Sequence, residues 1–343
     1  MRIAPVMAPR TIRLETAPVP VPGPGEALVR ITAVGICGSD LQYYAQGRIG
    51  DLEFGAGHVL GHEVAGVVET LGPGAEGPLP GTPVAVDPAI HCGRCRFCLS
   101  GHPNLCEELR FFGSPPVSGA FCDFVAHPAH LLLPLPPGTR PAVGAATEPL
   151  GVAIHAVDLG HLTLGDSVAV LGCGPIGLLI ARVAQLAGAA RVVATEPLAH
   201  RRAAAPKFGI ATVIDPTRED AVQRILEETG GIGVDVVFET AGSPEATEQA
   251  VRVVRPGGTL VLLGYWKFDQ VTLPGITAMR KGLTVRFVRR MKNAFPRAID
   301  LVRRNLVDLS LLITHEFPLD DIAHAFERAE LRAPDVIKAV VTM

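Results

Sequence analysis

Four cysteines lie within one short stretch of the chain in which Pro, Gly, His and Arg are frequent. With the spacing C-x2-C-x2-C-x7-C, they are Cys92, Cys95, Cys98 and Cys106. Four thiols at such spacing are typical of a structural zinc ion with four sulfur ligands in a tetrahedron. Two disulfides or a redox-active pair are the alternatives, but the N-terminus lacks a secretory signal pattern and a redox pair needs only two thiols. We therefore predict one zinc ion that stabilises a lobe and takes no part in catalysis.

A second set of metal-binding side chains precedes this lobe. Cys37 lies in a Gly-Ile-Cys-Gly-Ser segment, and His62 with Glu63 lies in a Leu-Gly-His-Glu segment. A thiolate, an imidazole and a carboxylate can hold zinc and leave one coordination position open, as catalytic zinc sites do. Each residue alone is weak evidence, because a single cysteine is usually a small buried hydrophobic residue and a single His is usually hydrogen-bonded. Their occurrence together with a four-cysteine lobe favours a catalytic zinc site.

A glycine-rich motif in the middle of the chain has a strand-like and a helix-like segment on its two sides. The motif G-x-G-x-x-G contains Gly172, Gly174, Pro175, Ile176 and Gly177. It follows an apolar run at 167–171 and precedes small and apolar residues at 178–187. In this context, glycines allow the backbone to approach a pyrophosphate at a helix N-terminus. The motif therefore predicts a dinucleotide site.

A second strand-like run, residues 191–195, ends in Glu196. In dinucleotide-binding folds an acid at the end of the second strand binds the ribose 2′-hydroxyl. Because a carboxylate would repel a 2′-phosphate, we predict NAD rather than NADP. Glu196 could instead be an exposed loop acid, and the nearby Arg201 could weaken the discrimination.

The order of these motifs resembles that of the zinc-containing medium-chain dehydrogenase/reductase superfamily over essentially the whole chain. Within it, the polyol dehydrogenases of the sorbitol and xylitol type are the most similar, as the segment at 35–50 with its Gly-Arg-Ile-Gly end indicates. Further similar segments are Val59-Leu-Gly-His-Glu63, Phe111-Phe112 with Pro115-Pro116, Glu148-Pro-Leu150, and Thr314-His-Glu-Phe-Pro-Leu319.

This resemblance implies an α/β fold with a β-rich GroES-like catalytic domain and a Rossmann domain, whose sheet is parallel and doubly wound. The expected segments are 1–150 for the catalytic domain with its zinc lobe, 151–287 for the NAD-binding domain, and 288–343 for a return to the catalytic domain. The sequence texture agrees, because short apolar runs between Pro and Gly give way to alternating strand-like and helix-like segments. The six expected parallel strands are 168–171, 192–195, 212–214, 234–239, 259–263 and 284–288.

Composition limits the classes of partner. The 343 residues, 48% of them hydrophobic, suffice for two cores. A net charge of −3 gives no basic face for nucleic acid, and no apolar run is long enough for a membrane span. A reducing cytoplasm is the expected location, because it suits zinc-bound and free thiols alike. The resemblance implies a homotetramer or homodimer.

The resemblance also assigns roles around the catalytic zinc. Zinc lowers the pKa of a bound hydroxyl, which lets a secondary alcohol release hydride to the nicotinamide. Glu148 would be an exchangeable or outer carboxylate, Ser39 would pass on the alcohol proton, and Tyr43 would line the pocket. Members of the family commonly have a histidine where this chain has Gln42, which cannot titrate near neutral pH. Tyr43, water or the cofactor ribose would then have to complete the proton path.

The remaining expected contacts surround cofactor and substrate. Those to the cofactor are Leu263, Gly264, Tyr265, Val288, Arg289 and Arg290. Those to the substrate are Tyr43, Phe112, Glu148 and Arg290. Met291 stands where sorbitol dehydrogenases have a tyrosine, so one polar contact to a polyol is missing.

These features predict a dehydrogenase with two zinc ions and NAD that oxidises a secondary alcohol of a polyol to a ketose. An L-idonate-type aldonate 5-dehydrogenase is an alternative, because residues 92–98 and 110–114 are similar to that group, and Arg289 or Arg290 could then pair with a carboxylate. Threonine and butanediol dehydrogenases share the metal ligands. A non-catalytic NAD-binding sensor on the same fold is the alternative outside enzymes. The presence of all the zinc ligands, Ser39 and Glu148 argues against it.

Overall fold

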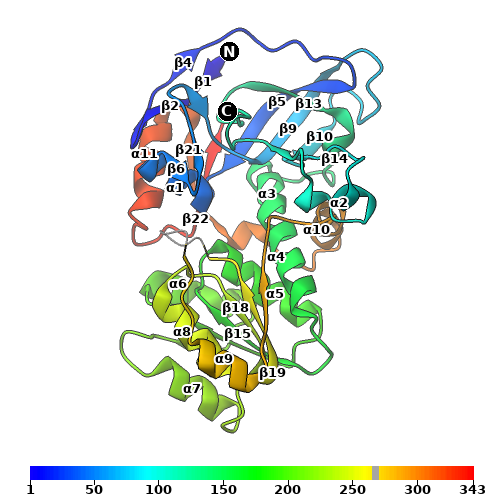
Figure 1. The fold of residues 1–343 in the computed structure, drawn as a ribbon. Coiled ribbons are helices and arrows are strands. Elements are labelled where there is room, and N and C mark those ends of the chain that lie inside the picture. The colour runs from blue at the N-terminus through cyan, green and yellow to red at the C-terminus, as the bar shows by residue number, and fades with distance from the viewer. Residues whose placement is uncertain (265–269) are drawn as a thin grey trace. The chain divides into compact units, whose positions relative to one another are not determined.

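The computed structural model describes residues 1–264 and 270–343 (Figure 1). Internal contacts divide the chain into two compact units. The first comprises Met1–Glu148 and Phe295–Met343, and the second comprises Pro149–Ala294. We expected the two division points after residues 150 and 287.

A seven-stranded sheet forms the centre of the first unit. Its order is β14-β10-β9-β5-β22-β21, and β13 pairs with β5 beside this path. Only β21 and β22 run parallel among the described strand pairs of this sheet. The strands are β5 (Glu26–Gly35), β9 (Glu63–Leu71), β10 (Pro83–Val86), β13 (Phe124–Pro128), β14 (Leu132–Pro134), β21 (Ile313–Pro318) and β22 (Lys338–Thr342). The β-rich character predicted for this domain is confirmed.

Helix α11 (Ile322–Glu330) contributes its apolar face to the core of this unit. Phe326 of this helix is fully buried, and its ring centroid lies 5.3 Å from that of Phe121 and 5.1 Å from that of Tyr44. Tyr44 belongs to α1 (Gly38–Gln46). These aromatic contacts anchor α1, which begins at a candidate zinc ligand, to the core.

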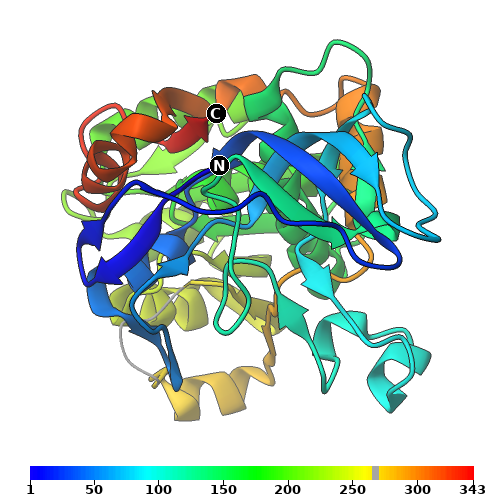
Figure 2. The ribbon, with the colours of Figure 1, turned by 90° about the horizontal axis from the view of Figure 1, so that it is seen from above.

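Short elements complete the first unit. The strands are β1 (Arg2–Ile3), β2 (Pro5–Ala8), β3 (Thr11–Ile12), β4 (Glu15–Thr16), β6 (Arg48–Ile49), β7 (Leu52–Glu53), β8 (His58–Val59), β11 (Ala89–Ile90) and β12 (Arg110–Phe111). The helices are α2 (Arg96–Leu99), α3 (Pro141–Ala145) and α10 (Phe295–Arg303). Figure 2 shows the segment around α2, coloured cyan, as a lobe that stands away from the central sheet of the unit.

A six-stranded parallel sheet forms the centre of the second unit. Its order is β17-β16-β15-β18-β19-β20, which is the order of a doubly wound nucleotide-binding sheet. The strands are β15 (Ser167–Leu171), β16 (Arg191–Thr195), β17 (Thr212–Ile214), β18 (Val234–Glu239), β19 (Val254–Leu262) and β20 (Thr284–Phe287). The Rossmann fold is confirmed. The expected strands agree with the observed ones to within one residue at each end, except that β19 begins at Val254.

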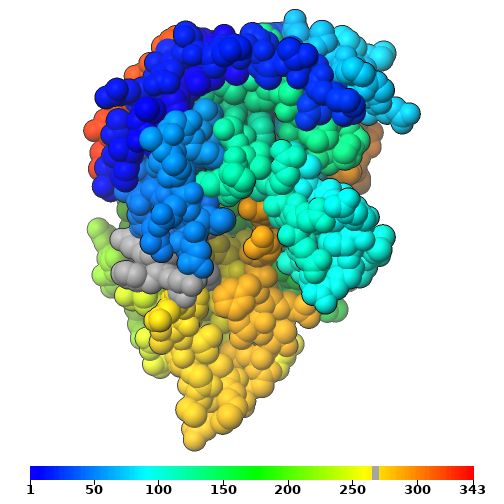
Figure 3. Space-filling model, turned by 45° about the horizontal axis from the view of Figure 1, so that its top comes forward, coloured from blue at the N-terminus to red at the C-terminus, as the bar shows by residue number. Residues whose placement is uncertain are grey.

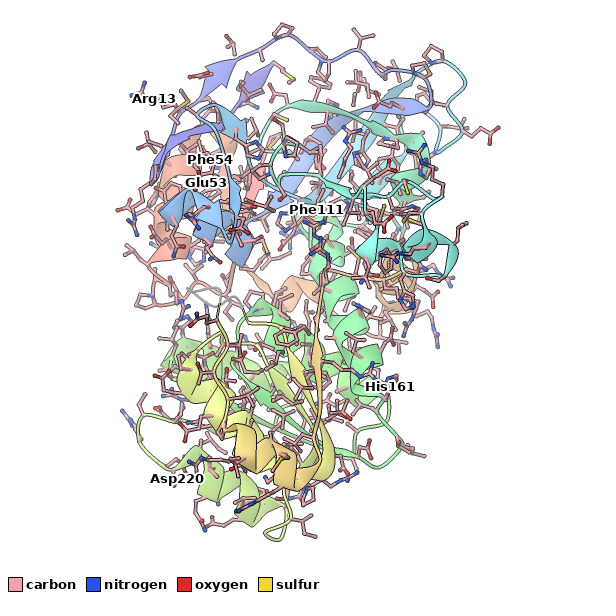
Figure 4. The ribbon with its side chains drawn as sticks, in the orientation of Figure 1. Arg13, Glu53, Phe54, Phe111, His161 and Asp220 are labelled. Atoms are coloured by element: carbon pink, nitrogen blue, oxygen red, sulfur yellow. The ribbon has the colours of Figure 1, made fainter. Side chains whose placement is uncertain are left out.

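Helices cover both faces of this sheet. Helix α8 packs on β18 and β19, α9 packs on β19, and α5 packs on β15 and β16. The helices are α4 (Thr147–Gly160), α5 (Pro175–Leu186), α6 (Ala199–Ala204), α7 (Ala221–Glu228), α8 (Pro244–Val253) and α9 (Gly275–Lys281). Asp220, labelled in Figure 4, caps α7 by accepting the N–H groups of Val222 and Gln223 at 2.9 and 3.1 Å. None of the helices in the described ranges combines the length and apolarity needed to cross a bilayer.

Residues 288–294 belong to the second unit, whereas we expected them in the return to the first. Two contacts explain the difference. The N–H of Val288 donates to the carbonyl of Leu262 at 3.0 Å. Met291 is buried, and it packs so closely on α4 that a Cβ added to Gly151 would lie 2.6 Å from its sulfur.

Candidate functional site

The four cysteines of the lobe come together around α2. Their sulfur atoms all lie within 4.8 Å of one another, with 4.0 Å between Cys92 and Cys98 and 3.6 Å between Cys95 and Cys98. A tetrahedral zinc ion with sulfurs at about 2.3 Å holds them about 3.8 Å apart, whereas a disulfide bond is about 2 Å long. The separations fit the predicted structural zinc and exclude disulfides among these residues.

Backbone amides of the lobe point at the sulfurs. The N–H of Cys92 donates to Sγ of Cys106, and the N–H of Cys95 donates to Sγ of Cys92, both at 3.3 Å. The backbone N–H groups of Cys98 and Glu107 lower the pKa of the Cys95 thiol to about 6. Cys95 therefore favours the thiolate, which is the form that binds zinc, whereas desolvation raises the pKa of the Cys98 thiol to about 12.

The three predicted catalytic ligands converge at one point of the first unit. The ligand atoms of Cys37, His62 and Glu63 lie within 4.8 Å of one another. Cys37 is the N-cap of α1, while Glu63 begins β9 opposite Gly35 of β5. His62 and Glu63 are buried. A thiolate, an imidazole and a carboxylate that face one another in this way fit a zinc ion with an open coordination position.

Asp40, which we did not predict as a site residue, links the ligands. One of its carboxylate oxygens accepts the N–H of Cys37 at 2.9 Å. The other accepts the N–H of Gly61 at 3.2 Å and lies 3.5 Å from Nδ1 of His62. Burial alone would lower the pKa of His62, but the Asp40 carboxylate and the Cys37 thiolate outweigh burial and raise it well above its ordinary value. Asp40 thus orients His62, as outer carboxylates orient zinc-binding histidines.

Glu148 is buried in the first turn of α4, close to the same cluster. Burial raises the pKa of this carboxyl to about 8; the Glu63 carboxylate adds to the rise, while His62 and Lys338 oppose it. A carboxyl with this pKa holds a proton at neutral pH and can donate a hydrogen bond. Its role as the exchangeable or outer carboxylate stays a prediction.

The predicted proton-path residues Ser39 and Tyr43 lie on the buried face of α1. The hydroxyl oxygen of Tyr43 is 3.2 Å from that of Ser114, another residue that we did not predict. Because either hydroxyl can donate, this pair can pass a hydrogen bond in either direction. The parts of Ser39 and Tyr43 in proton transfer stay predictions.

Two neighbouring phenylalanines lie in different surroundings. The ring of Phe111, labelled in Figure 4, is 5.3 Å from that of His62. Phe112 is buried, and its ring is 5.2 Å from that of His127. Phe111 is thus beside a candidate zinc ligand, whereas the substrate contact of Phe112 stays a prediction.

The glycine motif forms a tight turn between β15 and α5. Gly172 has a φ of +107°, and a Cβ added to Gly177 would lie 1.9 Å from the carbonyl oxygen of Gly172. Gly174 is the N-cap of α5, and Pro175 and Ile176 open its first turn. A turn of this shape brings backbone amides to a helix N-terminus, where phosphate binds. Cofactor contacts of these five motif residues stay predictions.

Glu196 is buried at the end of β16. One carboxylate oxygen accepts the N–H of Cys173 at 2.8 Å, and the other accepts the N–H of Leu198 at 2.9 Å. The carboxylate therefore braces the glycine-rich turn. Arg201 approaches the same turn, since a Cβ added to Gly174 would lie 3.4 Å from its Nη1. The ribose contact of Glu196 and the effect of Arg201 stay predictions.

Other expected cofactor contacts lie at the carboxyl ends of β19 and β20, the edge at which doubly wound sheets bind ligands. The N–H groups of Leu263 and Gly264 donate to the carbonyl of Glu239 at 2.9 and 3.2 Å. Val288 directly follows β20. Tyr265 lies outside the described residues.

Arg289 is exposed and Arg290 is half-buried. Arg290 has a φ of +56°, a left-handed conformation that is uncommon for a residue with a Cβ and that clusters at functional sites. Contacts of these two arginines with cofactor or substrate stay predictions.

Glu239, which we did not predict either, is a fully buried acid at the end of β18. One carboxylate oxygen accepts the N–H groups of Ala241 and Gly242 at 2.9 and 2.7 Å. Burial raises the pKa of Glu239 to about 7, although these backbone N–H groups oppose the rise. A Cβ added to Gly264 would lie 2.7 Å from the other oxygen. Glu239 thus fixes the turn after β18 close to Gly264, which is one of the expected cofactor contacts.

Two known families match the two halves of the chain. Residues 23–137 match the alcohol dehydrogenase GroES-like domain, and residues 175–304 match the zinc-binding dehydrogenases. The sorbitol dehydrogenase of Bacillus subtilis is 34% identical over 341 residues, which are 99% of this chain and 97% of that protein. This chain belongs to the zinc-type medium-chain alcohol dehydrogenases. Zinc and NAD(P) are its cofactors, and the resemblance stated from the sequence is confirmed.

Two solved structures are similar to this dehydrogenase along its whole length. The L-idonate 5-dehydrogenase from Escherichia coli is 29% identical with a TM-score of 0.92, and the match covers 100% of this chain and 98% of that one. A putative zinc-binding dehydrogenase from Sinorhizobium meliloti, bound to NADP, is 31% identical with a TM-score of 0.91, and the match covers 100% and 99%. Family membership therefore leaves several substrate classes open.

Sequence signals existed for two of the charged residues that we did not predict. Asp40 follows Cys37 by three positions, as the acid of a capping box follows its N-cap. Lys338 is the one charge in the apolar run 336–341, where a lysine is unusual unless it is paired. Glu239 had no such signal, because an acid at the end of a strand is commonly exposed.

We expect Cys98→Ser to reduce the zinc content from two ions per chain to one and to lower the unfolding temperature, because the lobe loses a ligand of its structural metal. Elemental analysis by mass spectrometry and scanning calorimetry measure the two quantities. Cys122→Ser is the matched control, since Cys122 is a buried thiol outside both clusters. Two zinc ions retained in Cys98→Ser would contradict the assignment.

We expect Glu239→Gln to stabilise the second unit increasingly as the pH rises. The folded protein keeps a proton on Glu239 up to a pH of about 7, whereas an unfolded chain releases it near 4.5. The wild type therefore loses stability between these pH values, by at most about 3 kcal/mol, and the variant does not. The difference in unfolding temperature between variant and wild type is measured at pH 5 and at pH 8. An equal difference at both pH values would refute the assignment.

Proposed function

We propose that this dehydrogenase oxidises a secondary alcohol of a polyol, of the sorbitol or xylitol kind, to a ketose with NAD. The observation that carries the proposal is the ligand set of half-buried Cys37 and buried His62 and Glu63, with the carboxyl group of Glu148 near it. The similarity to sorbitol dehydrogenase over 99% of the chain supports the polyol class.

The proposed reaction separates a hydride from a proton. The C–H bond of the alcohol carbon breaks, and the hydrogen leaves with the electron pair to C4 of the oxidised nicotinamide. The hydroxyl proton goes to solvent, so alcohol and NAD⁺ give ketone, NADH and one proton. Zinc at the ligand set supplies the lowered pKa of the hydroxyl that starts this separation.

Side chains of the first unit would handle the proton and orient the polyol. Ser39 Oγ is the proposed first acceptor of the hydroxyl proton, because it lies on the buried face of α1 two residues after Cys37. Glu148, protonated at neutral pH, would donate a hydrogen bond to a substrate hydroxyl. Tyr43, oriented by its contact with Ser114, would line the pocket.

The buried acids around the ligand set favour a substrate whose only negative charge is the one that forms when its hydroxyl loses a proton. Asp40, Glu63 and Glu148 are buried acids, and the Lys338 ammonium beside them is already paired with Glu63. A substrate carboxylate bound here would add another negative charge to this group. L-idonate stays the second candidate because of the solved E. coli relative, and Arg289 or Arg290 would then pair with its carboxylate.

NAD is the proposed cofactor. The Glu196 carboxylate is fixed by the N–H groups of Cys173 and Leu198, so a negative charge is held at the end of β16. The 2′-phosphate of NADP would bring further negative charge to this position. NADP is the alternative, because the similar S. meliloti structure is bound to it.

All seven cysteines are free thiols. The lobe and the ligand set together use five of them, and zinc binding requires reduced sulfur. We therefore propose that the protein works in a reducing compartment, for which the cytoplasm is the usual case.

Self-association through β20 is also proposed. This strand is at one edge of the six-stranded sheet, so a second copy could pair with its outer side. Ile276 and Met279 of α9, which packs on the neighbouring strand β19, and Phe287 of β20 expose 63%, 69% and 59% of their surface. Figure 3 shows the segment coloured yellow to orange, which includes α9, on the surface of the unit. Exposed apolar residues at a sheet edge favour a homodimer as the first step of assembly.

We expect the zinc-loaded protein to form NADH with sorbitol, xylitol or ribitol at least tenfold faster than with L-idonate, L-threonine or 2,3-butanediol. Initial rates with NAD and with NADP measure this preference. A preference for L-idonate would replace the polyol proposal with aldonate oxidation. If protein that carries two zinc ions per chain forms no NADH with any of the six substrates, the NAD-binding sensor would be favoured.

Glu196→Gln is the matched variant for the cofactor part of that experiment. Glutamine can still accept a backbone hydrogen bond, but it lacks the charge. The Glu196→Gln substitution should raise the ratio of kcat/KM with NADP to kcat/KM with NAD about tenfold. An unchanged ratio would remove Glu196 as the selector.

We expect Phe287→Glu to shift the protein toward the monomer, because it replaces an exposed apolar side chain of the edge strand by a charge in each copy. Analytical ultracentrifugation measures the distribution of states. Leu79→Glu is the control, since Leu79 is 71% exposed in the other unit. An equal effect of both substitutions would contradict an interface at β20.

A further inference from the structure

The side chain of Lys338 points into the first unit at the beginning of β22. This residue is only 3% exposed. Its Nζ donates to the carbonyl of Ile36 at 2.9 Å and to Oε1 of Glu63 at 2.5 Å, and it also pairs with the second oxygen of Glu63. Lysine is rarely buried so deeply without a partner, and here the partner is a candidate zinc ligand.

The backbone is shaped to admit this ion pair. A Cβ added to Gly35 would lie 2.0 Å from one carboxylate oxygen of Glu63 and 3.1 Å from Cε of Lys338. Gly35 lies opposite both Glu63 of β9 and Val340 of β22 in the sheet. A glycine on the middle strand thus leaves the room in which the two charged side chains meet.

The charges of the surrounding groups are mostly negative. Cys37 and Glu63 are the anionic members of the ligand set, and Asp40 and Glu148 are buried close to them. Lys338 is the cation that the structure bonds to this group within the described part of the chain. A buried ion pair that served only stability could often be replaced by apolar residues at little cost in free energy. The position of the Lys338–Glu63 pair beside the ligands therefore indicates a role in the site.

We propose that Lys338 sets the charge preference of the open metal position, so that an ionised ligand binds there in preference to a neutral one. Acting through Glu63, its fixed positive charge offsets the acidic groups. This lowers the electrostatic cost of one more negative charge at the open metal position. The inference rests on the proposed function, because alcohol oxidation is the reaction in which the substrate hydroxyl must lose its proton at this position.

Binding of small ligands to the cobalt-substituted holoprotein tests the proposal without turnover. Azide is the anionic probe and imidazole is the neutral probe, and visible absorption of the cobalt ion gives both dissociation constants. Lys338→Met removes the charge with little change in length. It should weaken azide binding at least tenfold and change imidazole binding less than twofold, while Lys338→Arg should keep most of the azide affinity.

A control and a second variant keep the test decisive. Lys281→Met removes another lysine, which donates to backbone carbonyls of Val251, Arg252 and Val254 in the second unit, and it should change neither constant. If Lys338→Met does not fold, Lys338→Gln retains a donor without the charge and takes its place. Equal changes for azide and imidazole, or no change for either, would overturn the proposal.

The two proposals can fail separately. Loss of azide preference in Lys338→Met together with no turnover of any alcohol would refute the proposed function and leave the role of Lys338 standing. Turnover of polyols together with an unchanged azide preference would refute the role of Lys338 alone.

Discussion

The burial of several acidic groups at one point is the constraint on which the first unit depends. The buried carboxyl groups of Asp40, Glu63 and Glu148 gather beside the half-buried thiol of Cys37. Uncompensated charges cost free energy in such surroundings. Three devices reduce the cost: the ammonium of Lys338 pairs with one acid, backbone N–H groups bond to Asp40, and burial keeps a proton on Glu148. A divalent cation at the ligand set completes the compensation.

The second unit handles negative charge with backbone groups instead. Its glycine turn, braced by Glu196, and the turn after β18, held by Glu239, both lie at the carboxyl edge of the parallel sheet. The close approach of Gly177 to Gly172 leaves no space for a side chain. Such turns supply N–H dipoles without a mobile side chain, so their position is set by the sheet and by the buried acids that hold them.

Local sequence patterns predicted the ligands, the glycine motif and all six parallel strands, because spacing and periodicity carry that information over short distances. Contacts between distant segments could not be predicted in this way. Glu63 and Lys338 are 275 residues apart, and neither local sequence indicates that the two residues are in contact. The same limit explains Phe111 and Phe112, since neighbouring residues around a strand point to different sides and the sequence does not say which side faces the ligands.

Residues 288–294 show a further limit of local patterns. They contain no glycine or proline signal to end the Rossmann unit after β20, and the division falls later because Met291 packs against Gly151. That contact depends on a residue from the start of the unit, so only the folded chain reveals it.

The charge balance of the first unit finally bears on what this dehydrogenase can accept. The thiolate of Cys37 and the carboxylate of Glu63 balance the two charges of a zinc ion, while Asp40 and Lys338 offset one another. In the metal-free protein, Glu148 keeps its proton at neutral pH and adds no charge to this balance. Loss of a proton from an alcohol would then place one negative charge there, and departure of the hydride removes it again by forming a neutral ketone. A substrate that brought a permanent carboxylate to the same residues would keep its charge throughout.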